Sequence, residues 1–308
     1  MCRGYVSAPC GSLADMTDAE VVEQIARQHL SPDVADRWLA LCRPAIRLEE
    51  LNGETVGETP AIATFGGLPR LPDDVEWPTW PGQGPLTYLG EIDLDAVARS
   101  GLDPGVRLPT TGRLLAFYFD GSVELFRDAN TGEHVKTVGY FEPGSTRAGA
   151  RLLHLPADDC AVRTAPLPDW GYPERRFFGR QILSTPDLEQ PVLFDTFAEG
   201  EDLTAFYQTH PVNADAFREA LRERNQAPWH QLGGWAMPVQ GPVEFEAVWA
   251  EGIEPGDPRT NDLARAWRPV LQIDSDEDFL WGDVGTLYWM QRERGEGGLD
   301  IEFTWQCC

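Results

Sequence analysis

The densest group of chemically capable side chains is an acidic run close to the C-terminal end of the sequence. Asp274, Asp276 and Asp278 alternate along the chain. Alternating carboxylates resemble the start of a calcium loop, but Phe279 stands where an EF-hand needs glycine and Gly285 where it needs glutamate. The spacing therefore excludes an EF-hand. Two interpretations stay open: a looser divalent-cation site, or turns in which the carboxylates accept hydrogen bonds from loop amides.

Tryptophans beside turns and one histidine form a second group. Trp77 and Trp281 lie next to proline or glycine, and His230 directly follows Trp229. Loop tryptophans suit a binding cleft that stacks on sugars, and paired carboxylates suit glycoside hydrolysis. The structural alternative is that the indoles close the ends of a β-rich core with their N–H groups bonded to loop carbonyls, while the histidine links neighbouring polar groups.

The common signatures of catalytic and cofactor sites are missing from the sequence. It has no Gly-x-Ser-x-Gly, Gly-x-Gly-x-x-Gly, P-loop or His-Glu-x-x-His motif, although catalytic triads form without a fixed sequence pattern. Its six cysteines include no Cys-x-x-Cys pair and its five histidines are scattered, so no zinc site is indicated. We therefore expect no cofactor and no bound metal.

The charge of the chain restricts its partners. Fifty Asp and Glu side chains stand against 25 Lys and Arg, which gives a formal net charge of −25. Such a surface repels phosphate groups, so neither nucleic acid nor an anionic membrane is expected as a partner. A basic protein is the complementary partner, because opposite charges accelerate the encounter of two proteins.

Hydropathy indicates neither a secretory nor a membrane-spanning segment. Residues 1–10 contain no apolar core of a signal peptide, and no run of 18 apolar residues occurs. A soluble, cytoplasmic protein is therefore expected. Cys42 ends an amphipathic helical pattern and is predicted to be a buried, unreactive thiol.

Capping signals predict helices at a few places. Thr17 and Glu20 form a capping box, and Ser31-Pro32 opens a second helix, so residues 17–42 are predicted to form a helical hairpin packed as an N-terminal appendage. Asp93 is a predicted cap of a short helix that ends at Gly101. Two further helices are predicted over 202–210 and 214–224, the second of them capped by Asn213.

Short apolar runs separated by proline and glycine predict strands through most of the remaining chain. A hairpin turn is predicted at Asp120-Gly121. The predicted strands are 86–92, 113–119, 122–126, 135–142, 151–155, 180–183, 243–249, 269–273, 286–291 and 301–306. These elements predict an α+β fold made mostly of short antiparallel strands.

Two short motifs recur in the same order in both halves of the sequence, which suggests an internal duplication. Gly66-Gly67 and Gly233-Gly234 lie 167 residues apart, and Ile92-Asp93 and Ile273-Asp274 lie 181 apart, each in the same order. We therefore predict a helical segment over 1–45 and a domain over 46–308 with pseudo-repeats at 60–155 and 228–308. The paired motifs are expected to meet near a pseudo-two-fold axis.

Several blocks of the sequence resemble the YwqG-like family of bacterial proteins of unknown function. They occur in order over about residues 45–308: Phe65-Gly-Gly-Leu-Pro, Leu86-Thr-Tyr-Leu-Gly-Glu-Ile-Asp93, His230-Gln-Leu-Gly-Gly234, Leu271-Gln-Ile-Asp274-Ser-Asp276, Trp281-Gly-Asp283-Val-Gly285 and Phe303-Thr-Trp-Gln-Cys307. The resemblance implies no catalytic residue. Some members of that family lie near toxin loci, which bears on biology and not on mechanism.

Pseudo-symmetry would bring the loops after equivalent strands to one cleft. The candidate cleft residues are Trp77, Asp93, His230, Asp274, Asp276, Trp281 and Asp283. One hypothesis is a non-catalytic binding protein for a basic partner, for example in immunity to a basic toxin. The alternative is a hydrolase or carbohydrate-active enzyme that uses loop carboxylates in an aromatic cleft. A carboxylate with a raised pKa in a deep pocket favours the enzyme, and a shallow acidic face favours the binding protein.

Overall fold

The molecule is built on one large antiparallel sheet with helices on its outside. The computed structural model describes residues 16–51, 60–120, 138–139, 144–156, 160–166, 171–198, 203–295 and 298–308. In these ranges the chain forms a ten-stranded sheet in which every pair is antiparallel, together with a two-stranded ribbon and helices. The predicted α+β, strand-rich fold class is confirmed.

The strands of the large sheet come from the whole length of the chain. They are β1 (Arg43–Glu50), β2 (Ala63–Phe65), β5 (Thr87–Asp93), β6 (Arg113–Tyr118), β7 (Ala150–Leu155), β8 (Arg175–Ser184), β9 (His230–Gly233), β10 (Arg268–Asp274), β11 (Thr286–Glu293) and β12 (Leu299–Gln306). The ribbon pairs β3 (Thr79–Trp80) with β4 (Gly84–Pro85). The order across the sheet is β12-β11-β10-β9-β1-β8-β2-β5-β6-β7.

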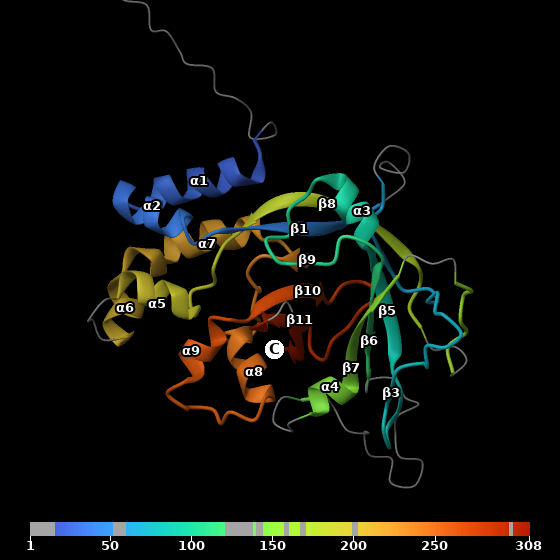
Figure 1. Ribbon diagram of the computed structural model, residues 1–308. Helices are drawn as coiled ribbons and strands as arrows, with labels where there is room; N and C mark the ends of the chain where they lie inside the picture. Colours follow the sequence, from blue (N-terminus) through green and yellow to red (C-terminus); the bar gives the residue numbers. More distant parts are fainter. Residues whose placement is uncertain are drawn as a thin grey trace, which may run out of the picture.

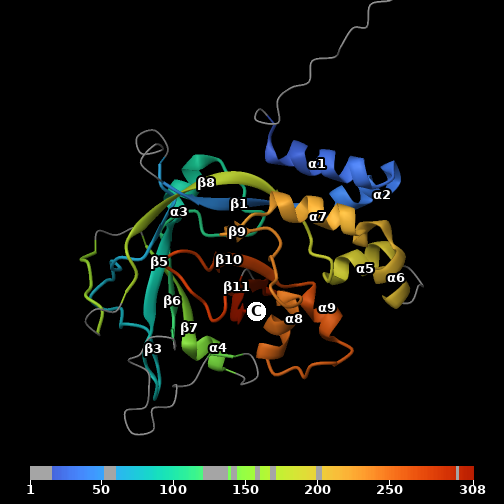
Figure 2. The same ribbon diagram turned by 180° about the vertical axis from the view of Figure 1, so that it is seen from behind.

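The sheet curls so that its two edge strands, β7 and β12, approach each other (Figures 1 and 2). The short helix α4 (Ser145–Gly149) lies at this seam. Thr146 and Arg147 of α4 both donate hydrogen bonds to Glu302 of β12, at 2.6 and 2.8 Å. The inner face of the curled sheet carries the main apolar core, in which Tyr118 of β6 packs against Phe303 of β12.

Strand order is symmetric about the central β1–β8 pair. On one side follow β9, β10, β11 and β12, and on the other β2, β5, β6 and β7. The first strand of each half therefore lies in the other half: β1 pairs with β9, and β8 pairs with β2. The two halves of the sheet thus repeat one arrangement with their first strands exchanged.

The register of the strands repeats with the same two offsets as the sequence motifs. Phe65 pairs with Gly90, and 167 and 181 residues later Leu232 pairs with Leu271. The β5–β6 ladder shifts register between residues 88 and 90, and the β10–β11 ladder shifts between 269 and 271. A bulge at the equivalent place in both halves is difficult to obtain from a chance recurrence of short apolar motifs, because bulges are specific local features.

The two Gly-Gly pairs adopt the same backbone conformation but do not meet. All four glycines have φ between +69° and +71°, a region that favours glycine. Gly67 N–H donates to the carbonyl of Tyr172, and Gly234 N–H donates to that of Pro104. Because β9 and β2 flank opposite sides of the antiparallel β1–β8 pair, Gly233 lies at the Ala45 end and Gly66 at the far end. The expectation that the Gly-Gly pairs meet near a pseudo-two-fold axis is therefore wrong.

The N-terminal helical hairpin shares its core with helices from the middle of the chain. Its helices are α1 (Asp18–His29) and α2 (Pro32–Leu39), and they pack beside α5 (Pro191–Phe197), α6 (Leu203–Thr209), the 3₁₀ turn η3 (Pro211–Asn213) and α7 (Asp215–Arg224). Trp38 and Phe217 meet edge to face there, with ring centroids 5.0 Å apart. Figure 1 shows this helical group at one end of the β1–β8 pair. The predicted boundary at residue 45 falls inside β1.

Local capping signals agree well with the observed helix ends. Thr17 and Glu20 form the predicted capping box of α1. Asp93 caps α3 (Leu94–Ser100) by accepting a hydrogen bond from Ala96 N–H at 2.7 Å, and Gly101 ends α3 in the left-handed conformation. The prediction for α7 is wrong in its cap: Ala214 takes that place, and the Asn213 side chain instead donates to the carbonyl of Phe206.

The predicted strand over 243–249 is wrong, because these residues form helix α8 (Val243–Ala250). Apolar residues at 243, 245 and 247 alternate with two glutamates, which is typical of a strand. In the structure both glutamates are buried as well: Glu244 accepts a hydrogen bond from Gln190, and Glu246 accepts from Thr304 and Gln306 of β12. With α9 (Thr260–Ala264), α8 covers the outside of β11 and β12.

Two of the strands predicted near the middle of the chain fall largely outside the residues that the structure describes. β6 pairs with β5 and β7, while the strand predicted at 122–126 and most of that at 135–142 lie outside the described residues. β1 has no counterpart among the predicted strands.

Among the helices that the structure describes, none is long and apolar enough to cross a lipid bilayer.

We predict that the Cys42 thiol resists alkylation in the folded protein. Burial raises its pKa to about 12, so almost no thiolate is present at pH 8. Cys308 is exposed and serves as the internal control. After brief treatment with iodoacetamide at pH 8, peptide mass spectrometry should find Cys308 modified and Cys42 intact, and both modified in denaturant. Equal labelling of both in the folded protein would contradict the prediction.

Candidate functional site

A groove of about 720 Å³ lies where β1 and β8 meet the loop after β10. Two of the predicted cleft residues, His230 and Asp276, line it. The other charged residues that line the groove were not selected by the sequence analysis. They are Arg47, Glu49 and Glu50 of β1, Arg175 of β8, and Glu277 and Asp278 of the loop. Four separate segments of the chain therefore build the groove.

At the bottom of the groove, His230 connects the backbone of Asp274 with the side chain of Asp276. Its side chain is 2% exposed and lies edge to face against Phe65 and Phe177. Nδ1 accepts a hydrogen bond from the backbone N–H of Asp274 at 3.1 Å. The proton of a neutral ring therefore resides on Nε2, which lies 3.0 Å from a carboxylate oxygen of Asp276. Both ring nitrogens are occupied.

Both carboxylate oxygens of Asp276 accept hydrogen bonds. One oxygen contacts His230 Nε2 and, at 2.8 Å, Nη2 of Arg175, and the other accepts hydrogen bonds from the N–H groups of Asp278 and Phe279. Burial opposes the charge of this carboxylate, but the hydrogen bonds from His230, the loop amides and Arg175 together hold its pKa well below the ordinary 3.8. Asp276 is therefore ionised at neutral pH.

Arg175 is shared by three carboxylates. Its guanidinium lies 2.8 Å from Asp276, 3.2 Å from Asp278 and 3.4 Å from Glu50. The same guanidinium lies 5.0 Å from the centre of the Phe279 ring. One positive charge thus faces three negative ones, two of them on the exposed rim of the groove.

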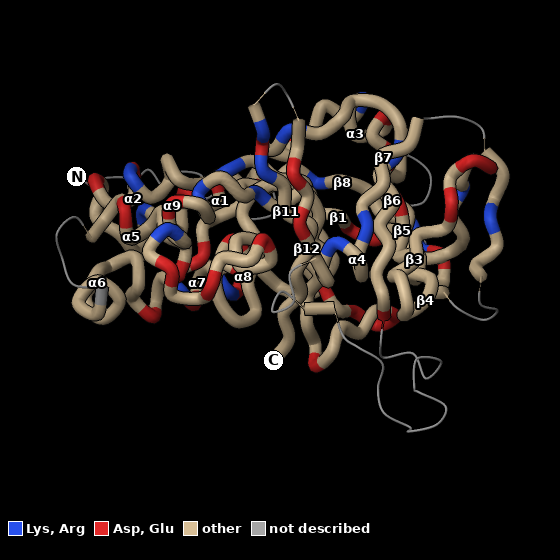
Figure 3. Tube along the Cα trace, turned by 60° about the horizontal axis from the view of Figure 1, so that its bottom comes forward, with Lys and Arg blue, Asp and Glu red and all other residues tan. Residues whose placement is uncertain are grey.

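The rest of the groove adds to the negative charge. Glu49 pairs with Arg180 at 2.7 Å, and Glu277 is exposed. Arg47 lies over the Trp229 ring, 4.0 Å from its centre, and donates to the carbonyls of Gln226 and Pro228. In the lining as a whole, two arginines face five carboxylates. Figure 3 shows acidic and basic positions interspersed along the described chain.

Asp274 and Trp281 have structural roles. Asp274 accepts hydrogen bonds from the N–H groups of Trp229 and Ser275 and from the Thr286 hydroxyl, at 2.7–3.0 Å. Trp281 is buried, donates from its indole N–H to the carbonyl of Asp274, and stacks on Phe279. The turn interpretation of the acidic run is the one that these contacts support.

The other three predicted residues lie away from the groove. Asp93 caps α3, and Trp77 donates to the carbonyl of Leu86 and packs edge to face on Phe117. Asp283 is exposed, and its backbone carbonyl accepts from Cys308 N–H. No cluster of three or more metal-ligating side chains is found within the described ranges.

The residues that sequence analysis missed are those contributed by β1 and β8. Glu50 and Arg175 are ordinary charged residues in sequence, and they face Asp276 only because β1 pairs with β8 and β9. A local signal did exist for the strand itself: Ala45, Ile46 and Leu48 are buried while Arg47 and Glu49 are only partly so. No local feature of the sequence specifies which strands pair with β1.

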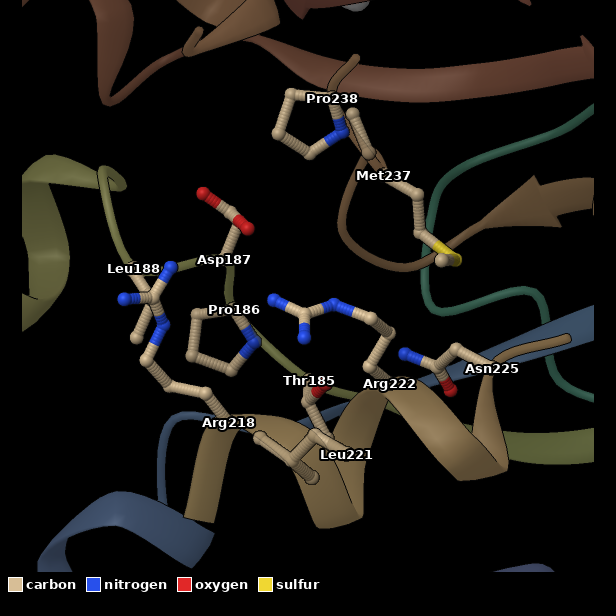
Figure 4. A pocket seen from close by; sticks show the side chains of 11 residues that line it. Thr185, Pro186, Asp187, Leu188, Arg218, Leu221, Arg222, Asn225, Met237 and Pro238 are labelled. Carbon is tan, nitrogen blue, oxygen red and sulfur yellow. The ribbon is translucent and has the colours of Figure 1, made fainter. Parts of the chain in front are cut away.

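Two smaller cavities lie on the helical side of the sheet. One, of about 240 Å³, is bordered by α7 and the loops after β8 and β9. Figure 4 shows Arg218 and Arg222 extending from α7 toward the loop that carries Pro186 and Asp187. The other, of about 140 Å³, is lined by buried Glu244 and by three arginines, Arg43, Arg265 and Arg268.

Comparison with known proteins gives a family. No curated protein matches the sequence. A family model described as a domain of unknown function (DUF1963) matches residues 63–295, which run from β2 to just past β11. That match covers most of the chain, including the loop that carries Asp276 and most of the groove, and so the chain belongs to the DUF1963 family.

Proposed function

We propose that this protein is a non-catalytic binding protein whose groove receives a basic side chain of a partner protein. The observation that carries the proposal is the sharing of Arg175 by Glu50, Asp276 and Asp278. The cluster retains two uncompensated negative charges, since its single cation is already used. A guanidinium or ammonium group that contacts the exposed rim carboxylates would compensate them.

The geometry at the bottom of the groove argues against a general acid–base role. A general base needs a free acceptor nitrogen, and both nitrogens of His230 are occupied. A general acid needs a raised pKa, whereas the pKa of Asp276 is lowered. The binding hypothesis is thus better supported than the hydrolase hypothesis at this groove.

Resemblance to the YwqG-like family and the acidity of the chain extend the proposal. We infer a bacterial cytoplasmic protein. The free thiols of Cys42, Cys307 and Cys308 are consistent with this location, because the cytoplasm keeps thiols reduced. A basic toxin neutralised by this protein is one partner of the required chemistry.

The test measures binding of a fluorescent nine-residue arginine-rich peptide at 150 mM salt, where distant charges are largely screened. The double variant Glu50→Gln/Asp278→Asn keeps the buried Arg175–Asp276 pair. It should weaken binding by about tenfold, or 1.4 kcal/mol. The matched control is Glu254→Gln, which removes an exposed carboxylate outside the groove. An equal effect of the control, or no binding by the parent protein, would contradict the proposal.

A further inference from the structure

The cavity of about 140 Å³ combines a buried glutamate with three arginines, of which Arg265 is paired with Asp195, in a chain where carboxylates outnumber basic residues two to one. It lies between the start of α5, helices α8 and α9, and the first residues of β1 and β10. Arg43 comes from β1, Arg268 from β10 and Glu244 from α8. It shares no lining residue with the acidic groove.

Neither Arg43 nor Arg268 has a carboxylate within ion-pair distance in the part of the chain that the structure describes. Arg43 lies over the Trp235 ring, 3.4 Å from its centre, and its buried Nη1 makes no hydrogen bond to any described residue. Arg268 donates only to the carbonyls of Arg265 and Trp267 among the described residues. Burial lowers the pKa of both guanidinium groups, which means that their positive charges are under-compensated.

Glu244 contributes a buried carboxyl group to the same cavity. Its side chain is 2% exposed, and Oε2 accepts a hydrogen bond from Gln190 Nε2 at 2.8 Å. Oε1 is also buried, and no described residue bonds to it. Burial raises the pKa of this carboxyl, while its own backbone N–H, Gln190, Arg268 and Arg43 act in the opposite direction. Because Oε2 accepts, the proton of the neutral form resides on Oε1, where it can be donated to a ligand.

We propose that this cavity binds the carboxylate group of a small organic acid. Arg43 and Arg268 supply the charge, and the Oε1 hydroxyl of Glu244 donates a further hydrogen bond. The other charged residues of the lining, Asp195 and Arg265, form a bidentate pair with each other and so leave the two arginines available to the ligand.

The size and the remaining lining of the cavity restrict the rest of the ligand. A volume of about 140 Å³ corresponds to roughly four or five waters, which suits an acid of about two to four carbon atoms. Pro191, Val192 and Ala264 provide apolar surface for an unsubstituted aliphatic tail. Butyrate has this size and polarity and is therefore the appropriate probe.

The test is titration calorimetry of the full chain at pH 6 with butyrate, butyramide and inorganic phosphate. We expect butyrate to bind and the neutral isostere butyramide not to bind. Arg43→Gln and Arg268→Gln should each weaken butyrate binding at least about tenfold, while Arg259→Gln, an exposed arginine paired with Asp257, should leave it unchanged. Circular dichroism of each variant identifies loss of the fold.

The Glu244→Gln variant tests whether Glu244 acts as a hydrogen-bond donor to the ligand or has only a structural role. Its amide keeps a donor in place, so it should retain butyrate binding and lose the weakening with rising pH that the parent protein shows as Glu244 ionises. The proposal is overturned if butyramide binds as well as butyrate, if phosphate binds better, or if a folded Arg268→Gln variant binds butyrate as tightly as the parent.

Discussion

Replacement of Gly233 with alanine is expected to lower the free energy of unfolding by about 3 kcal/mol and the melting temperature by about 5–10 °C. Gly233 has φ +70°, where a side chain costs roughly 1–2 kcal/mol. In addition, an added Cβ would overlap the carbonyl oxygen of Pro104, so the loop that contains Pro104 must move away. That movement would break the hydrogen bond from Gly234 N–H to the same carbonyl.

Gly82→Ala is the matched control, and thermal unfolding followed by circular dichroism is the measurement. Gly82 has φ +78°, but no atom lies within 4 Å of the position that a Cβ would occupy. This variant carries only the cost of the left-handed backbone, about 1 kcal/mol. Gly66→Ala, which would overlap the carbonyl of Pro173, should resemble Gly233→Ala. Equal effects of Gly82→Ala and Gly233→Ala would show that the close approach to the carbonyl is unimportant.

Asp276→Asn is expected to destabilise the fold by about 3–5 kcal/mol at pH 7, because it breaks a buried ion pair and leaves Arg175 without its nearest counter-ion. One oxygen of asparagine can still accept from the loop amides. Its NH₂ group would then face two donors, Arg175 Nη2 and His230 Nε2–H. His230 cannot relieve this by moving its proton, since Nδ1 must accept from Asp274 N–H.

Acid should reduce the difference between this variant and the parent protein. The pKa of Asp276 is lowered in the folded state, so its contribution to stability is present above the ordinary 3.8 and is lost as the pH falls below that value. Melting temperatures between pH 7 and pH 2.5 should therefore converge. Asp278→Asn, whose side chain is 35% exposed, is the control and should cost less than about 1 kcal/mol. A constant difference at every pH would contradict the assignment.

The elements that sequence predicted best are those specified by neighbouring residues. Thr17, Asp93 and Gly101 act within one helical turn, and the structure places each at the predicted helix end. The alternation over 243–249 was misleading, because a period of two in seven residues does not exclude a helix whose glutamates are buried against Gln190 and Thr304. Those partners lie more than fifty residues away in sequence.

The candidate site was predicted in part for the same reason. His230 and Asp276 were recognised by residue type and do face each other in the groove. Asp274 was selected on the same evidence, yet its oxygens are used by Trp229, which directly precedes β9, and by Thr286 of β11. Arg175, which defines the charge of the groove, carries no local signal at all. Strand pairing over long separations decides which charged residues become neighbours.

The exchanged first strands set the order in which the protein can be completed during translation. β1 finds its partners only in β8 and β9, and about 120 residues separate the end of β1 from the start of β8. At 5–20 residues per second, the ribosome needs roughly 6–25 s to supply β8. During that time a strand destined for the centre of the sheet has both edges unpaired, and the emerging N-terminal half cannot close. Chaperone binding to the nascent chain would be most useful in this interval.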